Sequence, residues 1–209
     1  MITIINYGAG NLFSVEKAFA ALGAEVCVSS NSADILSSDK IVLPGVGAFG
    51  DCMRQLSASG LIPAIKESVA KGIPLLGICV GLQILFEGSE ESSGVEGLNL
   101  LRGRVRKISA PHEKIPHMGW NALEFAENHR EKGLFKGIPQ SSYVYFVHSY
   151  YAAPEDMSIV SSSCFYGEKI TASISTKNIM ATQFHPEKSG DVGLNIIQNF
   201  IHNGSEGST

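Results

Sequence analysis

The middle of the sequence reads Pro74-Leu-Leu-Gly-Ile-Cys-Val-Gly-Leu-Gln83 and continues as Ile84-Leu-Phe86. An apolar run with strand character leads into Gly77-x-Cys79-x-Gly81, and an apolar helical stretch follows at once. This spacing is typical of a nucleophile elbow, in which glycines permit a tight, strained turn that exposes the nucleophile above a sheet. We expect the helix dipole to favour the thiolate of Cys79.

The first half of the chain alternates short apolar, β-branched runs with amphipathic stretches, which predicts a mainly parallel sheet flanked by helices. The expected strands are Ile2–Asn6, Glu25–Ser29, Lys40–Leu43 and Pro74–Ile78. The expected helices are Leu12–Leu22 and Leu61–Lys71, and a glycine follows each of them.

The second half predicts an added antiparallel portion, because its strand-like runs are short and separated by Gly, Pro, Asn or Ser. These runs are Leu101–Ile108, Met118–Phe125, Ser142–Val147, Ser158–Phe165, Ile170–Ser175 and Ile179–Phe184. A closing helix is expected near Val192–His202, and Gly88–Gly97 has the composition of an exposed loop. The fold class is therefore α/β, with one domain over residues 1–209.

Composition excludes several classes of function. The chain has 209 residues with 44% hydrophobic content, which is enough for one substantial core. Its net charge is −4 and its 16 Lys and Arg are scattered, which argues against nucleic acid as a partner. No segment approaches the ~20 apolar residues of a membrane helix, and Met1 leads into Ile2–Ile5 without a charged leader. We expect a soluble cytoplasmic protein without membrane contact.

The four cysteines show neither C-x-x-C pairs nor a Cys/His metal pattern, so we expect reduced thiols, no metal and no cofactor. Cys79 has an alternative interpretation as a buried core thiol, which is what most free cysteines are. Its two flanking glycines favour chemistry instead. Cys27 and Cys164 lie in strand-like runs, and Cys52 opens a helix without such a glycine pair, so these three are interpreted as structural.

A proton-handling partner for Cys79 is expected in Ile179-Met-Ala-Thr-Gln-Phe-His-Pro-Glu-Lys188. A strand delivers His185 at its end, and Glu187 follows two residues later, where its carboxylate can accept a hydrogen bond from the imidazole. The result is a nucleophile, a base and an orienting group. The other five histidines are interpreted as ordinary surface or core residues: His112, His117, His129, His148 and His202.

A glycine-rich loop follows another strand and reads Leu43-Pro-Gly-Val-Gly-Ala-Phe-Gly-Asp51. Its glycines free the backbone to turn N–H groups toward a ligand, as an oxyanion-stabilising loop requires. The alternative is an ordinary turn. A phosphate loop is excluded because no Gly-Lys-Ser/Thr follows.

Together, Gly77-x-Cys79-x-Gly81-x-Gln83, His185-Pro-Glu187 and Pro44-Gly-Val-Gly47 resemble the class I (triad) glutamine amidotransferases over essentially the whole chain. The resemblance implies that Cys79, His185 and Glu187 catalyse hydrolysis of glutamine through a γ-glutamyl thioester. It also implies an oxyanion site at the backbone of Val46, Gly47 and Val80, although the family usually has Leu at position 80. Substrate contacts are implied for Gly45, Gln83, His148, Ser149 and Tyr150; an exposed helix residue is the alternative for Gln83.

Three further segments resemble family members that pass ammonia to a separate (β/α)₈-barrel cyclase subunit: Ile5–Leu12, Pro116–Asn121 and Tyr145–Tyr150. Asn11, Trp120, Tyr145 and Lys188 match the interface positions of those members, and a core aromatic is the alternative for Trp120. Free hydrolysis would waste glutamine, so we expect the Pro44–Gly47 loop to complete the oxyanion site only in the complex. The remaining alternatives are a glutaminase serving another synthase, a γ-glutamyl peptide hydrolase, and a non-catalytic binding module.

Overall fold

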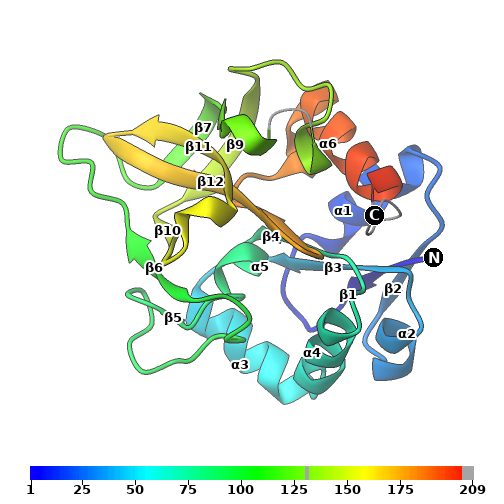
Figure 1. The fold of residues 1–209 in the computed structure, drawn as a ribbon. Helices are drawn as coiled ribbons and strands as arrows, with labels where there is room; N and C mark the ends of the chain where they lie inside the picture. Colours follow the sequence, from blue (N-terminus) through cyan, green and yellow to red (C-terminus); the bar gives the residue numbers. More distant parts are fainter. Residues whose placement is uncertain (130–131, 204–209) are drawn as a thin grey trace.

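The computed structural model describes residues 1–129 and 132–203, whose main sheet has eight strands in the order β2-β1-β3-β4-β13-β12-β11-β8 (Figure 1). The first five strands of this order are parallel: β2 (Val26–Ser29), β1 (Ile2–Ile5), β3 (Lys40–Gly45), β4 (Leu75–Cys79) and β13 (Ile179–Thr182). Antiparallel strands extend the sheet: β12 (Glu168–Thr176), β11 (Val160–Tyr166) and β8 (Glu124–Phe125). The predicted fold class is confirmed.

Helices cover both faces of the parallel strands (Figure 1). One face carries α1 (Leu12–Ala21) and α6 (Gly190–Asn203), and the other carries α2 (Ser32–Leu36), α3 (Phe49–Ser59) and α4 (Ile62–Ala70). Strands covered on both faces read as continuous apolar runs, and every residue of β1, β3 and β4 is buried. Among the described residues, no helix has the length and apolar character needed to cross a membrane.

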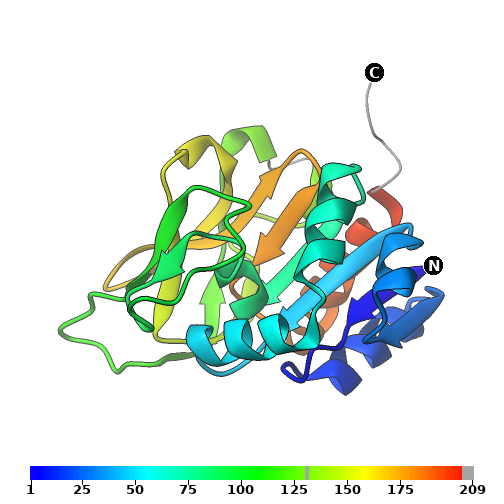
Figure 2. The same ribbon diagram turned by 90° about the horizontal axis from the view of Figure 1, so that it is seen from below.

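Two smaller sheets complete the antiparallel part, which Figure 2 shows beside the helix-covered parallel strands. One sheet contains β10 (Tyr150–Pro154), β6 (Gly103–Lys107) and β5 (Gly88–Ser89), and the other pairs β7 (His117–Ala122) with β9 (Tyr143–His148). The remaining elements are short: α5 (Val80–Gln83), η1 (Glu127–His129), η2 (Gly133–Phe135), η3 (Met157–Ile159) and η4 (Pro186–Lys188).

The predicted strand Met118–Phe125 is divided between two sheets. Its first part pairs with β9 as β7, and its last two residues pair with β11 as β8. Leu123, between them, is fully buried and its N–H donates to the Ser142 carbonyl at 2.9 Å, so the chain turns there from one partner strand to the other. The sequence patterns also gave no signal for α2 or β10.

The prediction of an exposed loop at Gly88–Gly97 is wrong for part of that segment. Its first two residues form the buried strand β5, which pairs with β6. Glu91 and Ser92 then accept backbone hydrogen bonds from Phe49 and Gly50 at 2.7 and 3.0 Å. These are the unpaired N–H groups at the start of α3, and polar composition alone gives no sign that a distant segment will satisfy them.

Candidate active site

Three parallel strands end side by side at one edge of the main sheet. Gly45 at the end of β3 pairs with Cys79 at the end of β4, and Thr182 at the end of β13 pairs with Ile78. The residues that follow β13, up to His185, therefore lie beside the cysteine. Ligand sites of such sheets lie outside the carboxyl ends of the strands, and a cavity of about 400 Å³ opens here.

Cys79 occupies a strained turn, as the elbow pattern predicts. Its φ is +56° and its ψ is −111°, a conformation that costs a non-glycine residue free energy unless its surroundings enforce it. The turn brings the backbone of Gly81 against the carbonyl oxygen of Leu43. Only glycine allows this approach, because a Cβ at position 81 would lie 1.9 Å from that oxygen. The following helix α5 has only four residues, so its dipole favours a thiolate less than the sequence pattern suggested.

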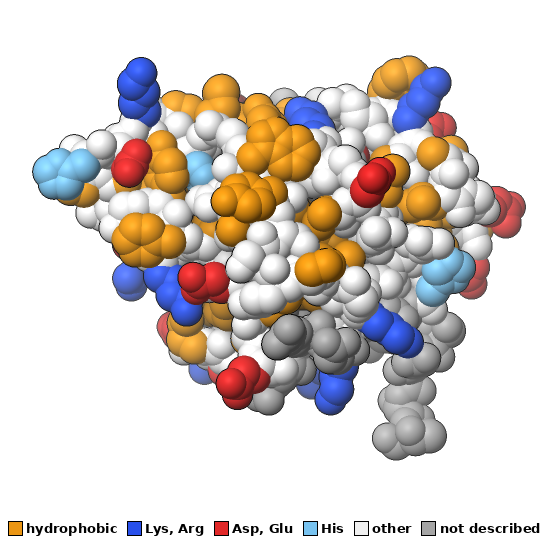
Figure 3. Space-filling model, turned by 90° about the horizontal axis from the view of Figure 1, so that it is seen from above, with side chains coloured by type: hydrophobic (Ala, Val, Ile, Leu, Met, Phe, Trp, Pro, Cys, Tyr) orange, Lys and Arg blue, Asp and Glu red, His pale blue; other side chains and the backbone are white. Residues whose placement is uncertain are grey.

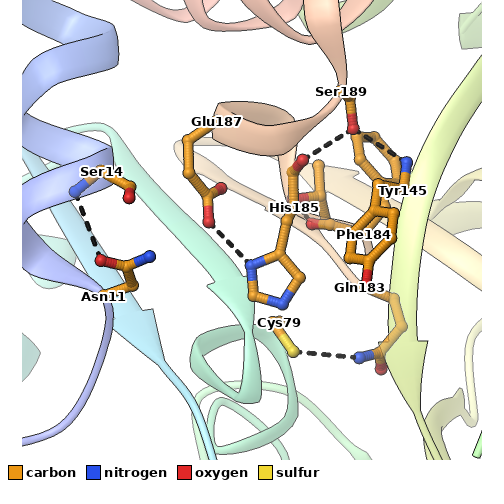
Figure 4. Close-up of polar contacts among 10 residues, drawn as sticks. Asn11, Ser14, Cys79, Tyr145, Gln183, Phe184, His185, Glu187 and Ser189 are labelled. Atoms are coloured by element: carbon orange, nitrogen blue, oxygen red, sulfur yellow. Dashed lines mark hydrogen bonds and ion pairs between the residues drawn. The ribbon is translucent and has the colours of Figure 1, made fainter. Parts of the chain in front are cut away.

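His185 lies between Glu187 and Cys79 (Figure 4). Its Nδ1 is 2.8 Å from Glu187 Oε1, and these two side chains are 2% and 1% exposed. A carboxylate only accepts hydrogen bonds, so Nδ1 carries a proton and Nε2 is left to exchange one with the sulfur. Glu187 Oε2 is buried without a hydrogen-bond partner among the described residues. Burying an unpaired oxygen costs folding free energy, so the stability of the fold does not explain this arrangement.

The charge environment of His185 favours imidazolium. Burial alone would lower its pKa, but hydrogen bonds to Cys79 and Glu187, together with their negative charges, outweigh burial and raise the pKa to about 10. A base with this affinity for a proton can take one from the thiol and hold it ready for a leaving group.

The backbone of His185 is held by residues on both sides of it (Figure 4). Its N–H donates to the Tyr145 carbonyl at 3.0 Å, and its carbonyl accepts from Ser189 Oγ at 2.7 Å. Ser189 Oγ in turn accepts the Tyr145 N–H at 2.9 Å. Ser189 was not predicted, because a serine at a helix start carries no sign of this closed ring of hydrogen bonds.

The glycine-rich loop is firmly held at its ends and weakly in its middle. Tyr7 Oη donates to the Pro44 carbonyl at 2.7 Å, and Glu91 accepts the Phe49 N–H beyond the loop. Between them, the Val46 carbonyl accepts from the Cys52 thiol at 3.3 Å, and S–H is a weak donor. Burial raises the pKa of both Tyr7 and Cys52, so both remain protonated donors at neutral pH.

Most of the predicted site residues line the same cavity. These are Val46, Gly47, Cys79, Val80, Gln83, His148, Ser149, Tyr150 and His185, together with Lys188. Gly45 does not line it; an added Cβ there would lie 2.7 Å from the Gly81 nitrogen, so only a glycine fits the close packing at this position. The exposed alternative for Gln83 is wrong, because its side chain is 3% exposed. Glu91 lines the cavity without having been predicted.

The four predicted interface residues have different surroundings. Asn11 caps α1 through a hydrogen bond from the Ser14 N–H at 3.4 Å, and Lys188 lines the cavity. Trp120 is 55% exposed, so the alternative of a core aromatic is wrong, and it lies edge-on to Tyr145 with ring centroids 6.3 Å apart. Hydrophobic side chains gather on the end of the molecule that carries β7 and β9 (Figure 3).

The remaining thiols lie on other elements of the fold, and the thiol of Cys52 contacts the glycine-rich loop. Cys27 lies in β2, Cys52 in α3 and Cys164 in β11, and all four cysteines are free. Within the described parts of the chain, no three His, Cys, Asp or Glu side chains are grouped so as to hold a metal ion.

The fold and this site define an α/β protein with a cysteine elbow, a buried His–Glu pair and a glycine-rich loop around one cavity. The family model described as "Glutamine amidotransferase class-I" matches residues 3–203, and the chain belongs to that family.

Curated relatives agree with this assignment, and a solved structure agrees with the fold. The chain is 48% identical over 206 residues to "Imidazole glycerol phosphate synthase subunit HisH" of Syntrophotalea carbinolica, covering 96% of this chain and 98% of the relative. The protein of the same name from Methanothermobacter thermautotrophicus is 48% identical, with 96% and 98% covered. The fold is similar to a solved "glutamine amidotransferase" with a TM-score of 0.73 and 16% identity, covering 96% and 99% of the two chains.

Proposed function

We propose that this chain is the glutaminase subunit of imidazole glycerol phosphate synthase. It hydrolyses glutamine to glutamate and ammonia and passes the ammonia to a cyclase subunit in histidine biosynthesis. The observation that carries the proposal is 48% identity over 96% of the chain to a synthase subunit of almost the same length. The cavity supports it independently, because the cysteine, the histidine and the glycine-rich loop meet there.

The proposed chemistry assigns one role to each group. Cys79 gives its proton to His185 and attacks the side-chain amide carbon of glutamine. Backbone N–H groups near Val46, Gly47 and Val80 stabilise the oxyanion. His185 then protonates the departing ammonia, and water cleaves the γ-glutamyl thioester. Glu187 holds the histidine in the tautomer that this exchange requires.

Charges around the cavity suit the two end groups of glutamine. Glu91 places a carboxylate on the wall, which complements an α-ammonium group, and Lys188 offers a cation to an α-carboxylate. Gln83 and the backbone of residues 148–150 supply further polar groups. The Tyr150 carbonyl already accepts from Gln83 and His148, so substrate contacts fall to the rest of that segment.

The proposed partner is a HisF-like (β/α)₈-barrel cyclase. Met118, Trp120 and Tyr143 are 62%, 55% and 58% exposed on the paired strands β7 and β9, and such exposed aromatic and Met side chains are typical of interfaces. Tyr145 lies on the same strand pair, and its backbone is bonded to His185. A partner on this surface would therefore contact the segment that holds the catalytic base. Asn11 and Lys188 are proposed to extend the interface.

We further propose that residues 1–209 act as one glutaminase domain in the cytoplasm. The other hypotheses predict different behaviour: another synthase would need another acceptor, a γ-glutamyl peptide hydrolase would need no partner, and a binding module would release no glutamate. The similarity to imidazole glycerol phosphate synthase subunits favours this synthase over the other hypotheses.

Reconstitution tests the proposal. The purified chain is mixed with a HisF-like barrel and the acceptor nucleotide, and glutamate release and acceptor conversion are measured together with glutamine or with ammonium salt as nitrogen source. The expected result is one glutamate per acceptor converted with glutamine, and conversion from ammonium without this chain. Glutamine hydrolysis that never couples to conversion would refute the assignment to this synthase.

A further inference from the structure

Gln183 is a fully buried amide beside the nucleophile, and no role has yet been given to it. It follows β13 and is 0% exposed. Its Nε2 donates to Cys79 Sγ at 3.8 Å, and its Oε1 accepts from Gln83 Nε2 at 3.0 Å (Figure 4 shows the first contact). Both ends of the amide are therefore engaged, and one of them touches the reacting atom.

The orientation of this amide follows from its neighbours. Gln83 Nε2 lies 3.0 Å from two acceptors, the Tyr150 carbonyl and Gln183 Oε1. Turning the Gln83 amide over would place its oxygen against the Tyr150 carbonyl oxygen, so its NH₂ group must face both acceptors. Gln183 Oε1 is held by one of those N–H groups, and this directs the Gln183 NH₂ group to the sulfur.

Two buried histidines extend the same chain of hydrogen bonds to the surface. His148 Nδ1 donates to the Tyr150 carbonyl at 2.9 Å, and its Nε2 lies 3.0 Å from His117 Nδ1. Burial lowers the pKa of His148 to about 3 and of His117 to about 4, so both rings are neutral and one tautomer of each satisfies every contact. His117 Nε2 then accepts from Asn121 Nδ2 at 3.3 Å on β7, next to the exposed Trp120.

We propose that Gln183 is a further catalytic residue, whose amide N–H stabilises the Cys79 thiolate, and that Gln83 is the positioning residue that aims it. When the thiol gives its proton to His185 Nε2, the electron pair stays on sulfur, and a hydrogen bond to an ionised acceptor is shorter and stronger than one to a neutral acceptor. The 3.8 Å contact is long, and it is expected to shorten when the sulfur carries a negative charge. The same N–H stabilises sulfur again when the thioester C–S bond breaks.

The catalytic role of Gln183 rests on the proposed function, but the stabilisation of the Cys79 thiolate by its amide N–H can be tested without glutamine. The rate of Cys79 alkylation by iodoacetamide reports the thiolate fraction, and peptide mass spectrometry separates Cys79 from the other thiols. The titratable groups that act on the sulfur are His185 after β13, Tyr7 after β1 and Cys52 on α3. Glu187 is hydrogen-bonded to His185, and Glu91, His148 and Lys188 line the same cavity. None of the substitutions below changes them.

Gln183→Met keeps the length of the side chain and removes the donor, while Gln183→Glu keeps the acceptor for Gln83 and removes the donor. Thr182→Val is the matched control, because Thr182 is equally buried at the preceding position, and the substitution removes only a hydrogen bond to the Phe184 carbonyl. We expect the midpoint of the alkylation pH profile to rise by about one unit in Gln183→Met, or roughly tenfold in rate below the midpoint. The midpoint should rise further in Gln183→Glu, and the midpoint of Thr182→Val should equal that of the wild type.

A Gln183→Met profile that coincides with the wild-type profile would overturn the proposal. If that variant does not fold, Gln183→Glu carries the test, with the same two outcomes. In glutamine hydrolysis the expected change is a kcat about tenfold lower at unchanged KM. A chain that hydrolyses no glutamine but shows the shifted profile would refute the proposed function and leave this inference, whereas an active enzyme with an unshifted profile would refute only the inference.

Discussion

His185 and the Val46–Gly47 loop line the same cavity, yet they are held by different kinds of contact. His185 is hydrogen-bonded through its ring to Glu187, through its backbone N–H to Tyr145 and through its backbone carbonyl to Ser189. The Val46 carbonyl is held by a thiol, and the Val46 side chain is 40% exposed.

The difference separates two tasks of the proposed enzyme. Proton transfer needs fixed geometry, and the buried His–Glu pair provides it before any substrate arrives. Oxyanion stabilisation needs a correctly aimed backbone N–H, which one peptide unit can supply or withdraw by rotating. Gly47, at φ +88°, ends that unit, and a weak S–H donor is a small barrier to its movement. Control is therefore expected in the loop and chemistry in the rigid part.

The largest effect is expected from breaking the rigid part at its nucleophile. Cys79→Ala should lower glutamine hydrolysis by at least about 10⁴-fold, because thioester formation is lost altogether. Ammonia-dependent synthesis by the complex should persist, which serves as the control for folding and assembly. Glutamate release near the wild-type rate would show that another residue is the nucleophile.

Replacing the base should cost almost as much. Triad residues act as a unit, so His185→Ala should lose about as much glutamine hydrolysis as Cys79→Ala. The loss in Glu187→Gln should be roughly one to two orders of magnitude smaller, because Glu187 orients the histidine without transferring protons. Single-turnover glutamate release compares the variants. A Glu187→Gln variant more impaired than His185→Ala would contradict these roles.

Fixing the loop should have an intermediate effect. Gly47→Val should remove the activation produced by the partner, about 10²–10³ in kcat, since a β-branched residue resists φ +88° and its rotation. Gly72→Val is the matched control: Gly72 has φ +84° after α4, and a Cβ at either glycine meets nothing within 4 Å. Equal losses of activation in both variants would show general strain instead of control.

The smallest effect is a dependence of stability on pH. The pKa of His185 is raised from 6.5 to about 10, so its protonation stabilises the fold fully below about pH 6.5, and this contribution is lost as pH rises toward 10. The difference in urea midpoint between wild type and His185→Gln should therefore shrink from pH 6 to pH 10. A difference that grows over this range would show that the imidazole is buried neutral.

The sequence predicted those features that depend on neighbouring residues in the chain. Apolar runs identified the four parallel strands of the first half, and glycine spacing identified the elbow at Cys79. The run 179–184 was expected in the antiparallel portion, which is wrong for β13, because it pairs parallel with β4. Tyr7, Glu91, Gln183 and Ser189 escaped prediction because their contacts join distant segments; Gln183 reaches Cys79 across 104 positions. The division of residues 118–125 between two sheets was missed for the same reason, since the partner strand and not the local sequence decides it.

The division between a rigid catalytic part and a controlling loop can be measured by steady-state glutamate release. The rate is compared for the isolated chain, for its complex with the cyclase barrel, and for that complex with acceptor nucleotide bound. If the rigid part is complete and the loop supplies control, the isolated chain should be nearly inactive and the nucleotide-bound complex should be faster by at least about two orders of magnitude. Equal rates in all three states would contradict the account, because the loop would then be a fixed turn and the oxyanion site permanently formed.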